Sequence, residues 1–327
     1  MIIDYSIIKK ITFGAEEIID INGVYEFYRF NHDELNAYKN NKDENIALKT
    51  TSASNIRFSF ITNSETLKFK CKFSKSSSRK FAYFDLYENN NLKGHKGSED
   101  YSDNFIDYEF SLSDGEKHIE LYFPWSVGVN IKDIVLDDNS YIKPVNRNGN
   151  ILFYGDSITQ GYDAHYPSLS YSNQVSRFLN MDSVNKGIGG EIFFPELLDC
   201  ASDNEYDKVF IAYGTNDWNS CEYDEFINNF KSFINKANKI YCNSSIYVIS
   251  PIWRVDENNE VKMKIKNYEI HNIMENICKD YKNITLINGR DLTPHYFSFF
   301  EDEYLHPNDL GFSIYANNLY KILSKKV

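Results

Sequence analysis

The stretch Ile151-Leu-Phe-Tyr-Gly-Asp-Ser-Ile-Thr-Gln-Gly161 decides how the second half of the chain is expected to fold. Its first four residues are apolar and have the length and composition of a strand that is buried on both faces. The small and polar residues that follow favour turns and helix starts. Because parallel α/β sheets bind ligands beyond the carboxyl ends of their strands, this turn is a candidate functional site.

From this stretch to the C-terminus, apolar segments alternate with segments of helical pattern. The predicted strands are 151–154, 183–185, 208–213, 245–250 and 284–288, and the predicted helices are 170–179, 195–200, 223–239, 261–281 and 308–323. Strands that alternate with helices are typical of a parallel sheet covered on both faces. We therefore predict an α/β fold with a flavodoxin-like parallel sheet.

The first half of the chain has a different pattern. Short segments with alternating or β-forming residues are separated by turn signals such as Asn89-Asn-Asn91 and Ser113-Asp-Gly115. This pattern predicts an all-β sandwich or jelly roll, with strands at 56–60, 67–73, 81–87, 106–112, 118–123 and 127–136. The first fifty residues are expected to add an edge strand or two and an irregular lead-in. The turn-rich segment 143–150 suggests two domains, 1–146 and 147–327.

Composition narrows the possible partners. The 327 residues carry a net charge of −12, and the most basic run, 70–79, fits an exposed strand and turn, so nucleic acid is not expected as a partner. The five cysteines form no C-x-x-C pair, and no histidine or carboxylate cluster has ligand spacing, so no metal or other cofactor is expected. The N-terminus does not resemble a signal peptide, and no apolar run has membrane-spanning length. These features predict a cytoplasmic protein with no membrane partner.

Small, polar and reactive residues follow the predicted strands at one rim of the sheet. They lie in Gly155-Asp-Ser157, Asn185-Lys-Gly-Ile-Gly-Gly190, Gly214-Thr-Asn-Asp217, Pro251-Ile-Trp-Arg254 and Leu305-His-Pro-Asn308. Taken singly, each motif also fits a turn, a helix cap or a surface residue. Taken together and in order, a serine after the first strand and a histidine near the last indicate a serine hydrolase, in which the imidazole activates the hydroxyl.

The order and the residues of these motifs resemble those of the GDSL/SGNH hydrolase superfamily, from about residue 151 to the C-terminus. The resemblance implies that Ser157 is the nucleophile and that His306 is its base. It also implies an oxyanion hole made by the backbone N–H groups of Ser157 and Gly190 and by the side-chain amide of Asn216. Position 159 is threonine, so the G-x-S-x-G elbow of α/β-hydrolases is absent.

The acid that orients His306 is not decided by the sequence. The family pattern is Asp-x-x-His, but Glu303 stands three residues before His306, and Asp302 stands one residue further back. Either carboxylate, with a weak preference for Asp302, fits the role of fixing the imidazole tautomer. A backbone carbonyl, which would leave a Ser–His dyad, is the third alternative, and both acids also fit exposed surface charges.

A β-sandwich ahead of such a domain resembles the two-domain carbohydrate esterases that remove acetyl groups from sugars. The substrate is therefore expected to be a short-chain ester, in particular an acetylated sugar. Candidate sugar-binding residues are Asp163, His165, Trp218, Trp253, Arg254 and His295, although core packing and loop-bracing ion pairs explain them equally well. The alternatives are an acyl-thioesterase or lysophospholipase, and a non-catalytic carbohydrate-binding protein. The sequence is also compatible with a homo-oligomer.

Overall fold

A parallel sheet forms the centre of the second half of the chain in this computed structural model, which describes residues 1–76 and 78–325. Its five strands are ordered β13-β12-β14-β15-β16, which is the flavodoxin-like order 2-1-3-4-5. The strands are β12 (Asn150–Gly155), β13 (Asp182–Gly187), β14 (Lys208–Ala212), β15 (Ser245–Ile249) and β16 (Ile284–Ile287). The predicted α/β fold is confirmed. Gly155 pairs with Gly187 and with Ala212, so three strands end level with one another.

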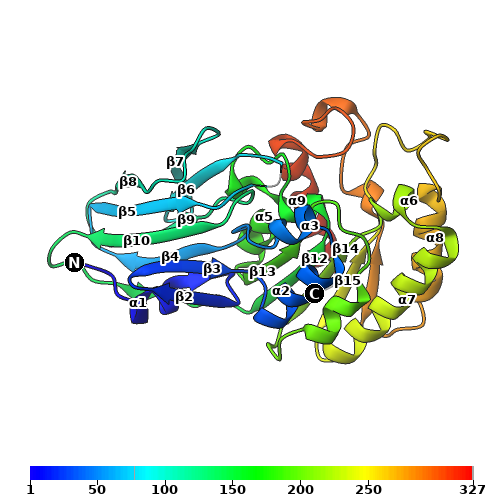
Figure 1. Ribbon diagram of the computed structural model, residues 1–327, viewed down its shortest axis with the longest axis horizontal. Coiled ribbons are helices and arrows are strands. Elements are labelled where there is room, and N and C mark those ends of the chain that lie inside the picture. Colours follow the sequence, from blue (N-terminus) through cyan, green and yellow to red (C-terminus); the bar gives the residue numbers. More distant parts are fainter. Residues whose placement is uncertain (77, 326–327) are drawn as a thin grey trace.

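Helices cover both faces of this sheet because neighbouring residues of each buried strand point to opposite sides. Ile151 and Phe153 pack with α5 (Tyr171–Leu179) and α9 (Asp309–Ser324) on one face. Leu152 and Tyr154 pack with α7 (Tyr223–Ile240) and α8 (Asn267–Cys278) on the other face. The short helices α4 (Ser157–Gln160) and α6 (Asp217–Ser220) begin just beyond two strand ends, and Figure 1 shows this half of the molecule on the right.

Two antiparallel sheets form the sandwich at the other end of the molecule (Figure 1), as predicted. The first sheet contains β1 (Thr12–Phe13), β4 (Arg57–Thr62), β9 (Lys117–Tyr122), β6 (Ala82–Glu88) and β7 (Asn91–Ser98), with β11 (Lys143–Pro144) beside β4. The second contains β2 (Glu17–Ile21), β3 (Val24–Tyr28), β10 (Val129–Leu136), β5 (Thr66–Phe73) and β8 (Ile106–Ser111). Edge-to-face contacts of Phe58, Phe84 and Phe123 are part of the core between the sheets.

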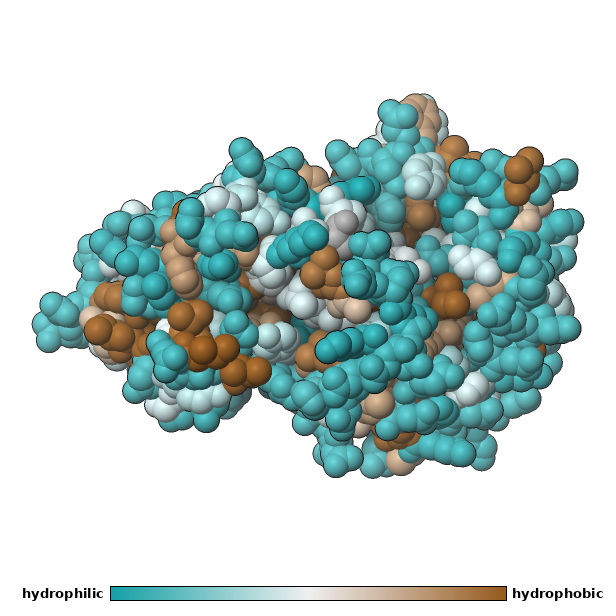
Figure 2. Space-filling model, in the orientation of Figure 1, coloured by the Kyte–Doolittle hydropathy of each residue, from teal (hydrophilic) through white to brown (hydrophobic). Residues whose placement is uncertain are grey.

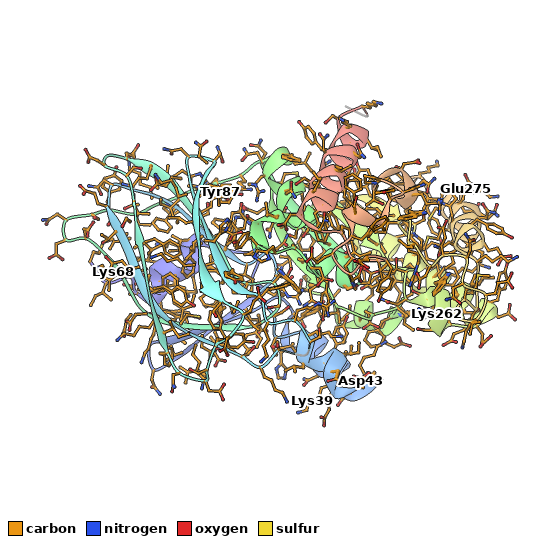
Figure 3. All side chains as sticks on the ribbon, turned by 90° about the horizontal axis from the view of Figure 1, so that it is seen from above. Lys39, Asp43, Lys68, Tyr87, Lys262 and Glu275 are labelled. Carbon is orange, nitrogen blue, oxygen red and sulfur yellow. The ribbon has the colours of Figure 1, made fainter. Side chains whose placement is uncertain are left out.

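The first fifty residues are more regular than predicted. They form α1 (Tyr5–Ile11), α2 (His32–Asn41) and α3 (Glu44–Lys49) in addition to three strands. Asn31 and Glu34 form a capping box at the start of α2, a sequence signal that the prediction missed. Figure 3 shows α2, which carries Lys39, at the junction of the two halves. Tyr38 of α2 lies in the core of the α/β half, with its ring 5.5 Å from that of Phe194. The division at residues 146 and 147 stays a prediction, and Tyr38 and Arg29 of the first part both contact the second part.

Three other elements differ from the prediction. Residues 261–266 are not helical, and α8 begins only at Asn267, where the Glu269 carboxylate accepts the Lys266 N–H and caps the helix. Residues Pro195–Cys200 form a 3₁₀ helix, with proline at its start, rather than an α-helix. Strand β7 follows the Asn89-Asn-Asn91 turn as the second arm of a hairpin, although its sequence, with Gly94 and Gly97, gives no strand pattern. The remaining 3₁₀ helices are Pro167–Leu169, Gly289–Asp291 and Phe297–Phe299.

The surface is mostly hydrophilic on the face shown in Figure 2, with apolar side chains gathered over the end of the sandwich. Exposed apolar side chains near this end include Ile2, Ile19 and Ile21, which lie beside α1 and on β2. None of the helices in residues 1–76 and 78–325 combines the length and apolar character needed to cross a bilayer.

Candidate active site

Ser157 lies at the start of α4, directly after the central strand β12. The Asp156 side chain caps this helix by accepting the N–H of Ile158 at 2.9 Å. Gly161 ends the helix with φ of 106°, a conformation that glycine adopts without strain. The tight turn therefore holds Ser157, which is 4% exposed, at the carboxyl edge of the sheet.

His306 lies between Ser157 and Asp302. Its Nε2 atom is 2.8 Å from the Oγ of Ser157, and its Nδ1 atom is 2.7 Å from the Oδ2 of Asp302. The side chains of His306 and Asp302 are 12% and 14% exposed, so the chain of hydrogen bonds is largely shielded from water. This geometry allows the imidazole to take a proton from the hydroxyl while the carboxylate stabilises the positive ring.

The structure places Asp302, rather than Glu303, against His306. Asp302 Oδ1 accepts the N–H groups of Tyr304, Leu305 and His306 at 2.8–3.1 Å, so the carboxylate also shapes the loop before His306. Burial raises the pKa of Asp302, but the hydrogen bonds and positive charge of His306 outweigh it and lower the pKa to about 2. Glu303 has φ of 65° and an exposed side chain, because the loop turns its residue away from the ring.

The loop after β13 carries Gly190, and the turn after β14 carries Asn216. Gly190 has φ of 85°, which favours glycine, and a Cβ there would lie 3.3 Å from the Cδ1 of Ile46. The Asn216 side-chain amide donates to the backbone oxygen of Glu191 at 2.9 Å, which joins the two strand ends. An amide NH₂ group has two hydrogens, so one N–H of Asn216 is free of this bond and available to a bound oxyanion.

Arg29, which the sequence analysis did not single out, ties the sandwich to the end of β13. Its fully buried guanidinium donates to the backbone oxygens of Ser52 at 2.7 Å, Lys49 at 3.1 Å and Gly187 at 3.1 Å, and also to that of Asn185. Burial lowers the pKa of Arg29 to about 9. Two of these carbonyls, those of Asn185 and Gly187, lie directly before the loop of Gly190.

A second set of contacts fixes the loop itself. The Gly189 N–H donates to Gln160 Oε1 at 2.8 Å, and Gln160 Nε2 donates to Ser52 Oγ at 3.1 Å. The Lys49 ammonium donates to the Gly189 oxygen at 2.6 Å. The sandwich half therefore helps to shape the backbone of the predicted oxyanion loop, a role for Lys49, Ser52 and Gln160 that only the folded chain reveals.

Two buried carboxyl groups support the same strand ends. Burial raises the pKa of both Asp156 and Asp217 to about 7. The Asp217 carboxylate accepts the N–H groups of Phe193 and Gly214 at 3.3 and 3.1 Å, which explains its place after Asn216. Both carboxylates therefore fix the backbone around the site by accepting its N–H groups.

Three predicted sugar-binding residues have structural partners instead. Trp218 is fully buried, with the Arg254 guanidinium 4.1 Å from its ring, so it presents no face to a sugar. Arg254 is 5% exposed and pairs with Asp256 at 2.6 Å. Asp163 is 4% exposed, pairs with Arg79, and lies on the Nδ1 side of His306, away from the nucleophile. Periodicity along the chain could not reveal these partners.

The other predicted sugar-binding residues remain accessible in part. Trp253 is half-buried, and its ring stacks on that of the exposed His295, with a centroid distance of 5.5 Å and an interplanar angle of 13°. His295 Nε2 also lies 2.8 Å from the Arg290 oxygen. His165 is exposed but packs against Phe81 and Tyr83 of the sandwich half. Of the six candidates, Trp253 and His295 thus form a pair beyond the carboxyl ends of the strands.

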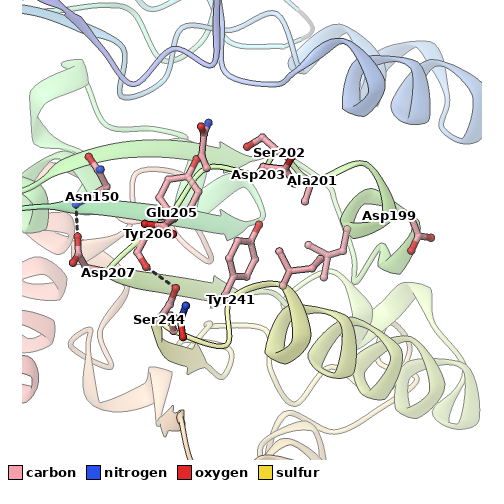
Figure 4. A pocket seen from close by; sticks show the side chains of 14 residues that line it. Asn150, Asp199, Ala201, Ser202, Asp203, Glu205, Tyr206, Asp207, Tyr241 and Ser244 are labelled. Carbon is pink, nitrogen blue, oxygen red and sulfur yellow. Dashed lines mark hydrogen bonds between the residues drawn. The ribbon is translucent and has the colours of Figure 1, made fainter.

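A cleft of about 680 Å³ lies at the opposite edge of the same sheet (Figure 4). Its lining includes Asn150, Asp207 and Ser244, which stand at or just before the first residues of β12, β14 and β15. The Asn150 N–H donates to the Asp207 carboxylate there at 2.8 Å. Ligands of open α/β sheets bind at the carboxyl ends of the strands, so this cleft is separate from the site of Ser157.

A flavodoxin-like sheet with Gly-Asp-Ser after its first strand, Asn after its third and His before its last helix defines the SGNH hydrolase fold. Residues 153–314 match the model of the GDSL-like Lipase/Acylhydrolase family, so the α/β part of the chain is similar to that family. The predicted resemblance is confirmed. No curated protein matches the chain.

Solved structures share the whole two-part fold. A salicylyl-acyltransferase from a tetracycline biosynthetic pathway, SsfX3, aligns with a TM-score of 0.81 at 17% identity, over 96% of this chain and 94% of its own. A Bacteroides ovatus protein described as a GDSL-like lipase aligns with a TM-score of 0.77 at 19% identity, over 97% and 96%. A family two carbohydrate esterase from Clostridium thermocellum, in complex with cellohexaose, gives 0.67 at 14% identity, over 84% and 94%. At these identities the likeness establishes the fold.

Proposed function

We propose that the protein is a serine esterase that hydrolyses short-chain acyl esters and removes acetyl groups from a carbohydrate. The observation that carries this proposal is the hydrogen-bonded chain from Ser157 through His306 to Asp302, with distances of 2.8 and 2.7 Å, at the carboxyl edge of the sheet. The family match of the same segment supports acyl transfer chemistry. The carbohydrate esterase with a similar fold supports the sugar.

In the proposed reaction, the Ser157 hydroxyl oxygen attacks the ester carbonyl while His306 Nε2 takes its proton. The backbone N–H groups of Ser157 and Gly190 and the side-chain amide of Asn216 then stabilise the oxyanion of the tetrahedral intermediate. Collapse of the intermediate breaks the bond to the alcohol, which leaves with the proton from His306. Water, activated by His306, releases the acetate from the acyl-enzyme and restores the hydroxyl.

The experiment that tests this function measures acetate released from a panel of acetylated mono- and oligosaccharides. We expect hydrolysis by the wild type and loss of hydrolysis in Ser157→Ala, while Ser220→Ala, which changes an exposed serine on α6, serves as the matched control. Circular dichroism checks that both variants fold. Undiminished activity of Ser157→Ala would refute the mechanism.

A nitrophenyl ester series of increasing acyl length separates the proposed function from a thioesterase or lysophospholipase. We expect the highest kcat/KM for acetate and a steep fall for longer chains. A preference for octanoate would favour the lipid-acting alternatives. Binding of acetylated sugars by a wild type that releases no acetate would favour a non-catalytic carbohydrate-binding protein.

A further inference from the structure

His306 Nδ1 faces two carboxylates. Besides Asp302 at 2.7 Å, the Oδ2 atom of Asp163 lies 3.4 Å from the same nitrogen. The ring nitrogen carries a single hydrogen, which can be shared between two acceptors but fully satisfies only one. Asp302 accepts the shorter hydrogen bond, and Asp163 is a second, more distant acceptor on the same side of the ring.

Asp163 is held in this place by the sandwich half of the molecule. Arg79, between β5 and β6, reaches Asp163 Oδ1 with Nε at 2.6 Å and Oδ2 with Nη2 at 3.0 Å. A two-bond contact of this kind fixes the plane and position of a carboxylate as well as its charge. The Asp163 side chain is 4% exposed and that of Arg79 is 38% exposed, so the carboxylate is shielded from water while the guanidinium is partly open to it.

Tyr162 also links the sandwich to the His306 ring. Its hydroxyl is 3.0 Å from the Oγ of Ser78, its ring lies 5.8 Å from the Arg79 guanidinium carbon, and its ring centroid is 5.6 Å from that of His306. Residues 78 and 79 of the sandwich therefore touch the two residues that back the imidazole. Asp163 itself has φ of 67°, a conformation that asparagine and aspartate tolerate better than other side chains.

The charges around the imidazole come from several elements. Asp302 precedes α9, Asp163 follows α4, Asp156 caps α4, and Arg79 comes from the sandwich. The guanidinium of Arg79 compensates the charge of Asp163, so a second carboxylate is tolerated beside Asp302 in a confined space. The same three groups, Asp163, Asp302 and His306, have ligand atoms within 4.8 Å of one another. The Arg79 cation and the His306 Nδ1–H account for these carboxylates without a metal ion.

We propose that Asp163 is a second carboxylate that orients the His306 imidazole, and that Arg79 positions Asp163. The sandwich thereby contributes a positioning residue to the active site. The inference rests on the proposed esterase function. Asp163 keeps the ring in the orientation that presents Nε2 to Ser157, and it takes over the Nδ1–H when Asp302 is lost. Arg79 acts through Asp163 and touches neither substrate nor the reacting atoms.

The test compares the effect of Asp163→Asn on kcat in two backgrounds, the wild type and Asp302→Asn, with p-nitrophenyl acetate as substrate. Loss of the sole acid of a Ser-His-Asp triad lowers kcat by about 10⁴. We expect Asp302→Asn alone to lose only about 10² to 10³, and the double variant to reach about 10⁴. Asp163→Asn should cost less than about tenfold in the wild type, with KM unchanged, because Asp302 still holds the ring.

Arg79 is tested by Arg79→Ala and Arg79→Lys in the same two backgrounds. We expect Arg79→Ala to lower kcat more in the Asp302→Asn background than in the wild type, and Arg79→Lys to restore part of the loss, since lysine keeps the charge without the two-bond geometry. The matched control is Lys143→Ala, which breaks an exposed ion pair of the sandwich with Glu116 (2.7 Å) and should leave kcat unchanged in both backgrounds.

If Asp163→Asn lowered kcat by the same factor in the two backgrounds, the inference would be overturned, because Asp163 and Asp302 would then act independently. A loss confined to thermal stability would also overturn it. Should Asp163→Asn fail to fold, the Arg79 variants give the same comparison. A wild type that releases no nitrophenol would count against the proposed function. The variants would then be compared by the rate at which a fluorophosphonate labels Ser157. An equal effect of Asp163→Asn on that rate in the two backgrounds would again overturn the inference.

Discussion

Asn216→Ala is the substitution that best separates a catalytic role from a structural role at the strand ends. The side-chain amide of Asn216 makes one bond, 2.9 Å to the Glu191 oxygen, and has a second N–H for a bound oxyanion. Losing a neutral hydrogen bond of this kind costs about 1 kcal/mol of folding free energy. Losing one oxyanion donor lowers kcat by about 10² to 10³, which corresponds to about 3 to 4 kcal/mol in the transition state. The catalytic loss should therefore clearly exceed the loss of stability.

The assay is hydrolysis of p-nitrophenyl acetate, with urea unfolding of the same preparations. We expect kcat of Asn216→Ala to fall by about 10² or more while KM changes little, since the donor acts on charge that develops after binding. Asn219→Ala, an exposed asparagine on the same helix α6, is the matched control and should retain full activity. A fall in kcat of less than about fivefold in Asn216→Ala would refute the assignment of this amide to the oxyanion hole.

Further predictions concern the acid, a packed glycine and two tryptophans. The pKa of Asp302, about 2 rather than 3.8, adds about 2 kcal/mol to the free energy of unfolding above pH 4, and this contribution is lost as the pH falls toward 2. Urea unfolding should therefore show wild type and Asp302→Asn converging below pH 4, and a constant gap would contradict the account. Gly189→Ala should lower the melting temperature, because its Cβ would lie 2.6 Å from the Tyr162 ring; an unchanged melting temperature would contradict this contact. Trp218→Phe should leave KM for an acetylated sugar unchanged and reduce stability, whereas Trp253→Ala should raise KM, and the reverse pattern would exchange their roles.

The parallel sheet and the ends of its strands were predictable because their signals are local. A run such as Ile151–Tyr154, followed at once by small and polar residues, specifies both a buried strand and the turn beyond it. The signals for helix starts are equally local, and the Asn31–Glu34 capping box shows that α2 could have been predicted from the sequence. The α8 start was misplaced because residues 261–266 carry no proline or glycine that marks a helix boundary, whereas the cap at Lys266 depends on the Glu269 side chain.

The partners of the site residues were not predictable, because they come from distant parts of the chain. Asp163 is bound by Arg79, and Trp218 is covered by Arg254. Neither relation leaves a periodic trace in the sequence, and a tryptophan on a site loop is compatible with a sugar platform and with a core residue alike. The choice of Asp302 depended on the loop conformation, which turns Glu303 outward with a positive φ.

A covalent acyl intermediate at Ser157 is the central feature of the proposed mechanism. The measurement is acid quenching of the enzyme during turnover of p-nitrophenyl acetate, followed by mass spectrometry of the intact chain and its peptides. We predict one acetyl group on the peptide that contains Ser157 in the wild type and none there in Ser157→Ala. An acetyl group that turns over on another residue, or full hydrolysis by Ser157→Ala, would contradict the account.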